Sequence, residues 1–230
     1  MSVTVVIPTY NQRPEYLAAA VESAKQPGVT VVVVDDGSTE PVQADAQVYR
    51  HETNRGIAAA LNTGVKATRT EWWCWLSSDD VFYPGKVARQ LEAKSPCSFH
   101  RYDVLGQDGE TIGCSPAVTR WQTVTEQRQA LAVNCWVNGS TVMIHRDVLL
   151  DVGLFDERLR YAQDWEMWNR IGRKYLWRFI PEVLGARREH GNLTARIDAN
   201  PGMRAERDAE DRQIHATYQP FGRPSGKRKS

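Results

Sequence analysis

Hydrophobic positions in the first 97 residues follow two patterns that alternate along the chain. Short apolar runs rich in β-branched or aromatic residues, at 3–8, 29–36 and 71–76, are typical of buried parallel strands, and 47–52 predicts a shorter one. Segments 13–25, 56–68 and 84–94 carry apolar residues at helical spacing, the last beginning at Pro84. Strands interleaved with helices predict an α/β fold, with a mixed, mainly parallel sheet flanked by helices.

The second half of the chain has a less regular pattern. Segment 97–113 predicts two strands joined by a turn at Asp108-Gly109. Helices are expected at 119–133 and 161–175, a strand leading into a helix at 140–153, and a strand at 177–189 that Pro181 turns into an edge or a bend. We therefore predict one domain over 1–197. It is followed by a charged helix and a basic, solvated tail over 198–230.

Charge and composition narrow the class of protein. The 29 Lys and Arg residues nearly balance the 28 Asp and Glu residues, so no nucleic acid or anionic membrane partner is expected. No stretch approaches the roughly 20 apolar residues of a membrane span, and the first residues do not resemble a signal peptide. The four cysteines are scattered without a CxxC pair, which predicts reduced thiols and a cytoplasmic protein.

Polar residues follow three of the predicted strands at their carboxyl ends. They are the stretches 8–11 (PTYN), 35–38 (DDGS) and 77–80 (SSDD). Ligands of open parallel sheets bind beyond the carboxyl ends of the strands. The preference of Asp, Asn, Ser and Gly for turns explains any one of these stretches. It explains much less well why three of them occur at the same edge of the predicted sheet.

Five motifs in order resemble the family 2 glycosyltransferases with the GT-A fold. They are VVIPTYN, VVVDDGS, NRGIAAALNTGV, LSSDD and AQDWEMWNRIG, and the resemblance covers about 3–194. It implies an inverting transferase that takes a sugar from a nucleoside-diphosphate sugar, with a UDP-sugar favoured. It also divides the domain into a nucleotide-sugar half at about 1–97 and an acceptor half at about 98–197.

The resemblance implies a donor site built from several segments. Tyr10 offers a stacking face to the base, and Asp36 accepts from a base imide, with Asp35 either an equal candidate or a cap of the turn. Gly56 allows a close approach of the backbone, and Arg55 is either a donor contact or a solvated cation. The residues expected to bind the nucleotide-sugar are Pro8, Thr9, Tyr10, Asp35, Asp36, Gly56, Asn62, Asp79 and Arg188.

The adjacent carboxylates Asp79 and Asp80 correspond to the family's acidic metal motif. The resemblance implies that Asp79 faces the ribose, while Asp80 and His190 hold Mn or Mg on the diphosphate. Ser77 and Ser78 stand where the commoner form has an earlier Asp, so weaker metal binding is expected without donor.

Asp164 occupies the position of the family's catalytic base, at the start of a predicted helix. Gln163 replaces the usual Glu, and Glu166 points about 200° away on the helix, so Glu166 is read as a surface acid. Trp165 is the preferred acceptor contact. Core packing is expected for at least two of Trp136, Trp165 and Trp168.

The acceptor is a glycan, a protein or a small molecule, and the segment 203–218 could serve a partner or a second copy of the chain. The main alternative is a non-catalytic nucleotide-sugar or glycan-binding module on the same scaffold. Retention of Asp36, Asp79, Asp80 and Asp164 argues against it. A nucleotidyltransferase would need a basic, Gly-rich loop after the first strand, and a dehydrogenase would need GxGxxG there.

Overall fold

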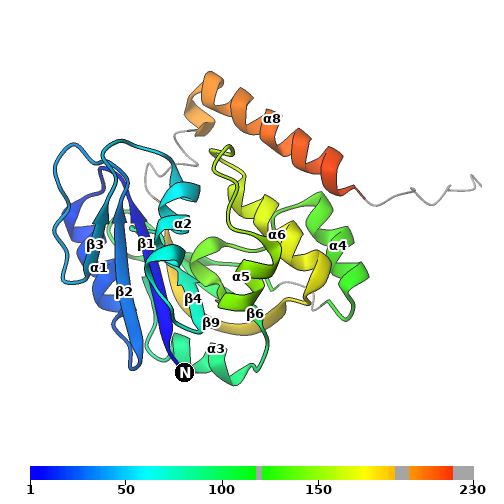
Figure 1. Ribbon diagram of the computed structural model, residues 1–230, viewed down its shortest axis with the longest axis horizontal. Helices are drawn as coiled ribbons and strands as arrows, with labels where there is room; N and C mark the ends of the chain where they lie inside the picture. The colour runs from blue at the N-terminus through cyan, green and yellow to red at the C-terminus, as the bar shows by residue number, and fades with distance from the viewer. Residues whose placement is uncertain (118–120, 190–196, 220–230) are drawn as a thin grey trace, which may run out of the picture.

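A computed structural model describes residues 1–117, 121–189 and 197–219. Among these residues one nine-stranded sheet runs through the molecule (Figure 1). Its strand order is β3 (Gln47–Arg50), β2 (Val29–Asp35), β1 (Val3–Thr9), β4 (Trp72–Trp75), β8 (Met143–His145), β6 (Cys97–Leu105), β9 (Arg178–Arg188) and β5 (Val81–Phe82), with β7 (Thr111–Cys114) beside β6.

Parallel pairing holds the amino-terminal half of the sheet together. The ladders β3–β2, β2–β1 and β1–β4 are parallel, as is β6–β9. Antiparallel pairing of β8 with β4 and β6, of β5 with β9 and of β7 with β6 makes the sheet mixed. The predicted fold class is therefore confirmed, and both predicted halves share this sheet.

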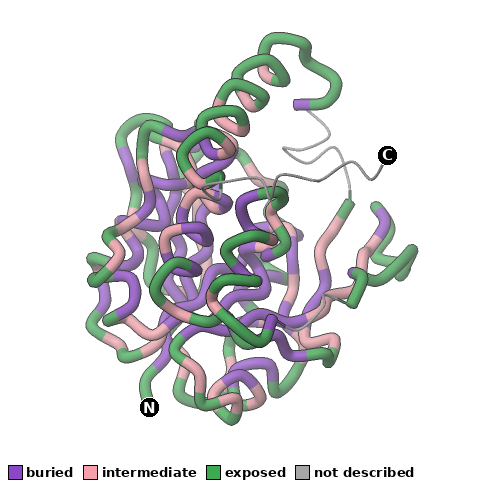
Figure 2. Tube along the Cα trace, turned by 90° about the vertical axis from the view of Figure 1, so that its right-hand side faces the viewer, coloured by how far each residue is buried: buried purple, intermediate pink, exposed green. Residues whose placement is uncertain are grey.

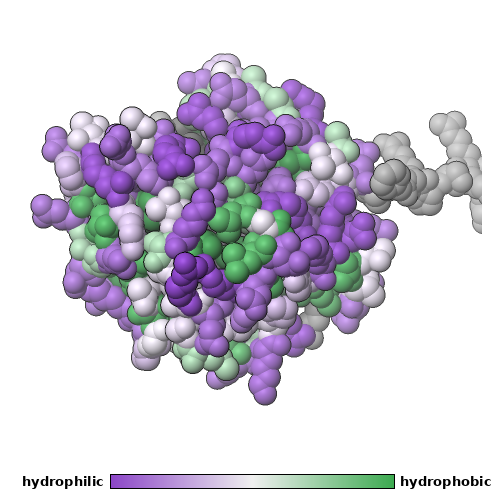
Figure 3. Space-filling model, in the orientation of Figure 1, coloured by the Kyte–Doolittle hydropathy of each residue, from purple (hydrophilic) through white to green (hydrophobic). Residues whose placement is uncertain are grey.

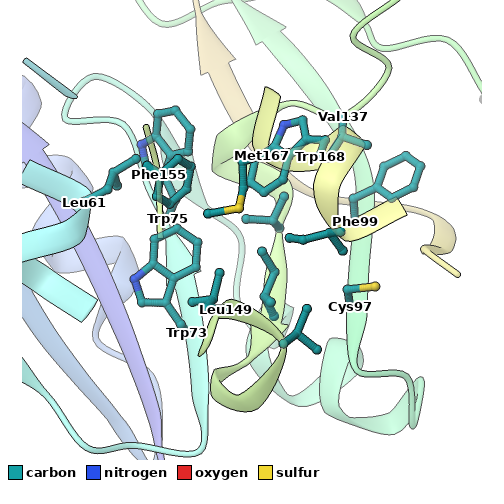
Figure 4. Close-up of a cluster of buried hydrophobic side chains, with 14 of the residues drawn as sticks. Leu61, Trp73, Trp75, Cys97, Phe99, Val137, Leu149, Phe155, Met167 and Trp168 are labelled. Atoms are coloured by element: carbon teal, nitrogen blue, oxygen red, sulfur yellow. The ribbon is translucent and has the colours of Figure 1, made fainter. Parts of the chain in front are cut away.

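Helices cover both faces of the sheet. On one face, α1 (Pro14–Ala24) and α3 (Lys86–Glu92) bury a cluster that includes Leu17, Val21 and Val87. On the other, α2 (Ile57–Ala67), α4 (Val124–Val133), α5 (Arg146–Val152) and α6 (Gln163–Lys174) pack over a larger cluster. Figure 4 shows Trp73, Trp75, Phe155 and Trp168 among its side chains. This aromatic core connects the two halves of the chain.

Two local predictions need revision or refinement. Pro84 does not begin a helix, because Gly85 is the N-cap of α3 in a left-handed conformation and the helix starts only at Lys86. Pro181 lies inside β9, which is flanked by β6 and β5, and the β6–β9 register shifts between His100 and Arg101. Because β5 pairs with β9 only at Gly185 and Ala186, Pro181 lies at a bulge where β9 pairs with β6 alone. The predicted edge or bend is therefore both a bulge and a local edge, where the missing proline N–H is tolerated.

The charged helix predicted at 202–219 is present as α8 (Pro201–Tyr218). It lies across α6 and α4 in Figure 1, and most of its length is exposed in Figure 2. The corresponding part of Figure 3 is mainly hydrophilic. Within the described ranges, no helix is long and apolar enough to cross a membrane.

Candidate functional site

The strand order places a topological switch point at the carboxyl ends of β1 and β4. Strands β2 and β3 lie on one side of β1, whereas β4 lies on its other side. The order in which successive strands are added to the sheet therefore reverses between β1 and β4. Such a switch point is the usual ligand site of an open α/β sheet. Strands β1 and β4 separate before Pro8, because β1 pairs with β4 only as far as Val6. Beyond Val6 no backbone N–H of β1 is needed for this pairing, so proline, which has none, is tolerated. Gln12 Nε2 donates to Ser78 Oγ at 3.3 Å and bridges the two strand ends.

The residues that follow β1 are cross-linked to those that follow β2. Asn11 has a positive φ of 49°, and its backbone N–H donates to Ser38 Oγ at 2.9 Å. The side chain of Tyr10 is 48% exposed, so a ring face is accessible for stacking, whereas Thr9 is buried. Sequence reasoning therefore located an accessible aromatic ring at the switch point.

Asp35 and Asp36 have different surroundings. Asp35 is fully buried, accepts the N–H groups of Ser38 and Val42, and pairs with Arg50. These are the contacts of a turn cap, which the sequence had left open as one of two roles.

Asp36 places a carboxylate of the chain itself at the amino-terminal end of α2. Its carboxylate accepts His51 Nδ1 at 2.6 Å, the Arg55 N–H at 3.0 Å and the Gly56 N–H at 2.8 Å. Gly56 is the N-cap with φ of 92°, a conformation that favours glycine. A carboxylate has about four acceptor positions, so Asp36 keeps one of them on Oδ2.

Asn62 and Arg55 connect this loop to the segment 153–162. Asn62 is buried, and its amide group bonds to the backbone of Phe155 and to Glu157 Oε1. Arg55 pairs with Glu157 at 3.1 Å. Any contribution of Asn62 to donor binding therefore acts through the position of this segment.

Asp80 is a buried carboxylate at the end of the β4 rim. Its Oδ2 accepts the Ser140 hydroxyl at 2.6 Å, and its Oδ1 accepts the Arg188 N–H at 2.9 Å. Burial and the neighbouring charge of Asp79 raise the pKa of Asp80 to about 7. A buried negative charge of this kind is stabilised by a cation.

Arg188 is brought to the same rim by β9. Its Nε lies 3.4 Å from the carbonyl oxygen of Asp79, and its guanidinium carbon lies 4.5 Å from the centre of the Tyr16 ring. The predicted donor residues Asp79 and Arg188, which are 109 positions apart, are therefore neighbours in the fold.

The oxygen ligands on the described residues fit Mn or Mg only in part. Asp79 and Asp80 offer carboxylate oxygens, which suit both ions. Among the described residues, no group of three His, Cys, Asp or Glu side chains could hold a metal. The other predicted ligand, His190, lies outside the described residues. An ion at Asp80 would thus need further oxygen ligands, such as those of a diphosphate.

Asp164 lies at the first turn of α6, in a second part of the site. It lines a cavity of about 240 Å³ together with Asn134, Cys135, Tyr161 and Trp165. Burial raises the pKa of Asp164 to about 6. The segment 134–141 connects the two carboxylates, since its first residues line this cavity and Ser140 donates to Asp80.

The three tryptophans considered for the acceptor site differ in exposure. Trp168 is fully buried in the core, and Trp165 is buried with its indole N–H donating to the Leu131 carbonyl. Trp136 is 42% exposed and donates to the Ala130 carbonyl. Core packing of two of the three is confirmed, although Trp165 also lines the cavity beside Asp164.

Several residues of this site were not found from the sequence. Ser140 belongs to an Asn-Gly-Ser triplet at 138–140, which gives no indication of a contact with Asp80. His51 and Gln12 had no distinguishing pattern. Arg207 and Asp211 also line the cavity, but they belong to α8, for which the sequence predicts only a charged helix that could serve a partner or a second copy of the chain.

Comparisons with known proteins agree with this geometry. The model of glycosyl transferase family 2 matches residues 4–136. An uncharacterized glycosyltransferase of Rickettsia prowazekii is 28% identical over 219 residues, covering 86% of this chain and 67% of the relative. The pre-mycofactocin glycosyltransferase of Mycobacterium tuberculosis is 27% identical over 212 residues, covering 80% of this chain and 42% of the relative.

A crystal structure of Staphylococcus aureus TarS in complex with UDP-GlcNAc shares the fold. It has a TM-score of 0.66 and 19% identity, and the match covers 95% of this chain and 71% of that chain, which comprises TarS residues 1–349. The family model, the sequence relatives and the fold lead to one assignment: the chain belongs to glycosyltransferase family 2, has the GT-A fold and is a transferase.

Proposed function

We propose that the chain is an inverting glycosyltransferase that moves a sugar from a nucleoside-diphosphate sugar to an acceptor hydroxyl. The observation that carries the proposal is a pair of carboxylates with raised pKa, the buried Asp80 at the switch point and the half-buried Asp164 in a cavity, linked by 134–141. A UDP-sugar is favoured as donor, in line with the UDP-GlcNAc complex of TarS. Residues 1–97 would bind the donor and 98–197 most of the acceptor.

The donor site would use residues on both sides of the switch point between β1 and β4. The Tyr10 ring stacks on the base, and the remaining acceptor position of Asp36 Oδ2 receives a base imide N–H. Pro8, Thr9 and the Asp35-capped turn shape the base pocket, while Gly56 lets the backbone approach the ribose.

The diphosphate would lie between the β4 rim and β9. Arg188 is a charged donor beside Asp79, and Asp80 with His190 would hold Mn or Mg there. Bound at this position, the ion would stabilise negative charge on the leaving diphosphate. Asp79 would meet the ribose, and Asn62 would fix the segment that contains Phe155.

Asp164 would act as the general base. The acceptor hydroxyl gives its proton to the Asp164 carboxylate as its oxygen bonds to the anomeric carbon. The bond from that carbon to the diphosphate breaks, and the electron pair leaves with the diphosphate. A pKa of about 6 leaves the carboxylate ionised at neutral pH and makes it a stronger base than an ordinary aspartate.

The proposal is tested by release of nucleoside diphosphate from UDP-GlcNAc and other nucleotide-sugars in the presence of Mn²⁺. Turnover by the wild type that falls by about 10²–10⁴-fold in Asp164→Asn supports it. A folded protein that binds a nucleotide-sugar but never turns it over would instead be a binding module.

A further inference from the structure

Helix α8 contributes directly to the cavity that contains Asp164. Arg207 and Asp211 line this cavity from α8, opposite Tyr161 and Trp165. The helix lies outside the 4–136 segment that the family model matches. The cavity is therefore completed by a part of the chain that this match does not cover.

The docking of α8 is anchored next to Asp164. The Glu210 carboxylate accepts the backbone N–H groups of Arg160, Tyr161 and Ala162 at 2.8–2.9 Å, just before α6 begins. Ala162 is the N-cap of α6 and has no side-chain cap bond of its own. Glu210 thus satisfies donors at this helix start, which would otherwise need another acceptor.

Apolar and aromatic contacts extend this anchor along the helix. Ile214 is buried in a cluster with Ala162 and Trp165. His215 meets the Trp165 ring edge-on, with centroids 4.8 Å apart, and the Tyr218 hydroxyl donates to Glu166 Oε1 at 2.8 Å. Because these contacts, from Glu210 to Tyr218, run over about two turns, α8 is a fixed wall of the cavity.

Arg207 and Asp211 have hydrogen-bonding capacity left for a ligand. Arg207 Nε lies 3.7 Å from Asp211 Oδ2, and its Nη1 lies 3.8 Å from Asp198 Oδ1. Both distances exceed those of hydrogen bonds. Burial raises the pKa of Asp211, as expected for a carboxylate drawn toward the cavity.

The charges of the cavity favour a neutral ligand. Among the described lining residues, Asp164 and Asp211 face one guanidinium, that of Arg207, so an anionic acceptor would meet more like than opposite charge from them. Hydroxyl groups can donate to Asp211 and accept from Arg207. The side chains of Tyr161 and Trp165 offer apolar surface to the C–H groups of a sugar ring.

We propose that α8 is the acceptor-specificity wall of this transferase, and that Arg207 and Asp211 bind hydroxyl groups of a neutral sugar acceptor beside Asp164. This inference rests on the proposed function. It assigns the acceptor class to carbohydrates and gives the charged helix a role in the site.

The test uses the full chain with UDP-GlcNAc and Mn²⁺, or whichever nucleotide-sugar the wild type hydrolyses. Acceptor probes are the neutral p-nitrophenyl glucoside, galactoside, mannoside and N-acetylglucosaminide, with the anionic p-nitrophenyl glucuronide for comparison. Arg207→Gln and Asp211→Asn are compared with matched changes at exposed positions of the same helix, Arg212→Gln and Asp208→Asn.

We expect transfer to at least one neutral glycoside, and a preference for it over the glucuronide. Losing a hydrogen bond to a charged group should lower kcat/KM for the acceptor by about 10- to 100-fold in Arg207→Gln and Asp211→Asn. The change should appear mainly in the acceptor KM, with the donor KM retained. Arg212→Gln and Asp208→Asn should keep the wild-type acceptor KM.

Three results would overturn the inference. They are donor hydrolysis without transfer to any neutral glycoside, a preference for the glucuronide, and an unchanged acceptor KM in folded Arg207→Gln and Asp211→Asn. If no nucleotide-sugar is turned over at all, the proposed function itself fails and the inference fails with it. Thermal unfolding of each variant identifies a loss that comes only from misfolding.

Discussion

Asp164→Asn should remove the proposed base and at the same time stabilise the folded protein. Burial raises the pKa of Asp164 from an ordinary 3.8 to about 6. Ionisation of this carboxylate therefore costs more in the folded state than in the unfolded state. Asparagine keeps the shape and can still accept the Trp165 N–H, which bonds to Asp164 Oδ1 at 2.6 Å.

The size and pH dependence of this stabilisation follow from the pKa. A rise from 3.8 to about 6 corresponds to about 3 kcal/mol of unfolding free energy. Because Asp164 is only half-buried at the cavity, solvent screening reduces the expected gain to about 1–3 kcal/mol. Below about pH 3 the aspartate is protonated in both states, because this lies below both pKa values, and the two proteins should be equally stable. The gain should develop between pH 4 and 6 and stay constant above.

Urea or thermal unfolding at pH 4 and pH 7.5 measures the effect, and each kcal/mol should move the Tm by roughly 2–4 °C in a chain of this size. Glu166→Gln is the matched control, because Glu166 pairs with Arg170 at 2.7 Å and its loss should not stabilise the protein. Transfer should fall by about 10²–10⁴-fold in Asp164→Asn, and the wild-type rate should decline as the pH drops below about 6. A stability difference between Asp164→Asn and the wild type that does not change with pH would refute the reasoning.

Three further substitutions probe the supports of the site. Gly139→Ala places a Cβ 2.3 Å from the Trp75 ring and should cost about 1–3 kcal/mol, seen as a lower Tm. Ser140→Ala removes the hydroxyl that donates to Asp80 at 2.6 Å and accepts the Ser77 N–H at 3.0 Å, so about 1–3 kcal/mol should be lost. Urea titrations should show a larger loss at pH 8, where Asp80 is ionised, than at pH 5, where the lost Ser77 contact still contributes. Glu210→Gln should lower the Tm and kcat together while sparing the donor KM, since it weakens the anchor at the start of α6; a loss confined to the donor KM would contradict that role.

The sequence predicts the amino-terminal half of the fold well for a physical reason. Buried parallel strands such as Val3–Thr9 and Val29–Asp35 are continuous apolar runs, and the intervening helices have clear periodicity. The ends of these runs place Tyr10 and Asp80 on one rim, because parallel strands align their carboxyl ends. Motif order therefore leads directly to the donor side of the candidate site.

The other parts of the candidate site depend on contacts between segments that are distant in the sequence, and such contacts leave no local sequence pattern. Ser140 meets Asp80 across 60 positions, and Glu210 meets Ala162 across 48. Only the tertiary fold brings such pairs together. The sequence of α8 predicts a charged helix, yet the buried Ile214, the Glu210 carboxylate and the contacts of His215 and Tyr218 hold it beside Asp164. The contribution of α8 to the cavity beside Asp164 follows only from the tertiary structure.

The central claim is that a nucleotide-sugar binds at the switch point between β1 and β4 with a divalent ion at Asp80. The most direct measurement is thermal unfolding of the wild type and Asp80→Asn with UDP or UDP-GlcNAc, each with and without Mn²⁺. At about 100 times its dissociation constant a ligand should add roughly 2.7 kcal/mol, or several degrees of Tm. The account predicts this shift for the wild type with nucleotide and Mn²⁺ together, little shift with Mn²⁺ alone, and a much smaller shift for Asp80→Asn. Equal shifts in the two proteins, or no shift in the wild type with any nucleoside diphosphate, would contradict it.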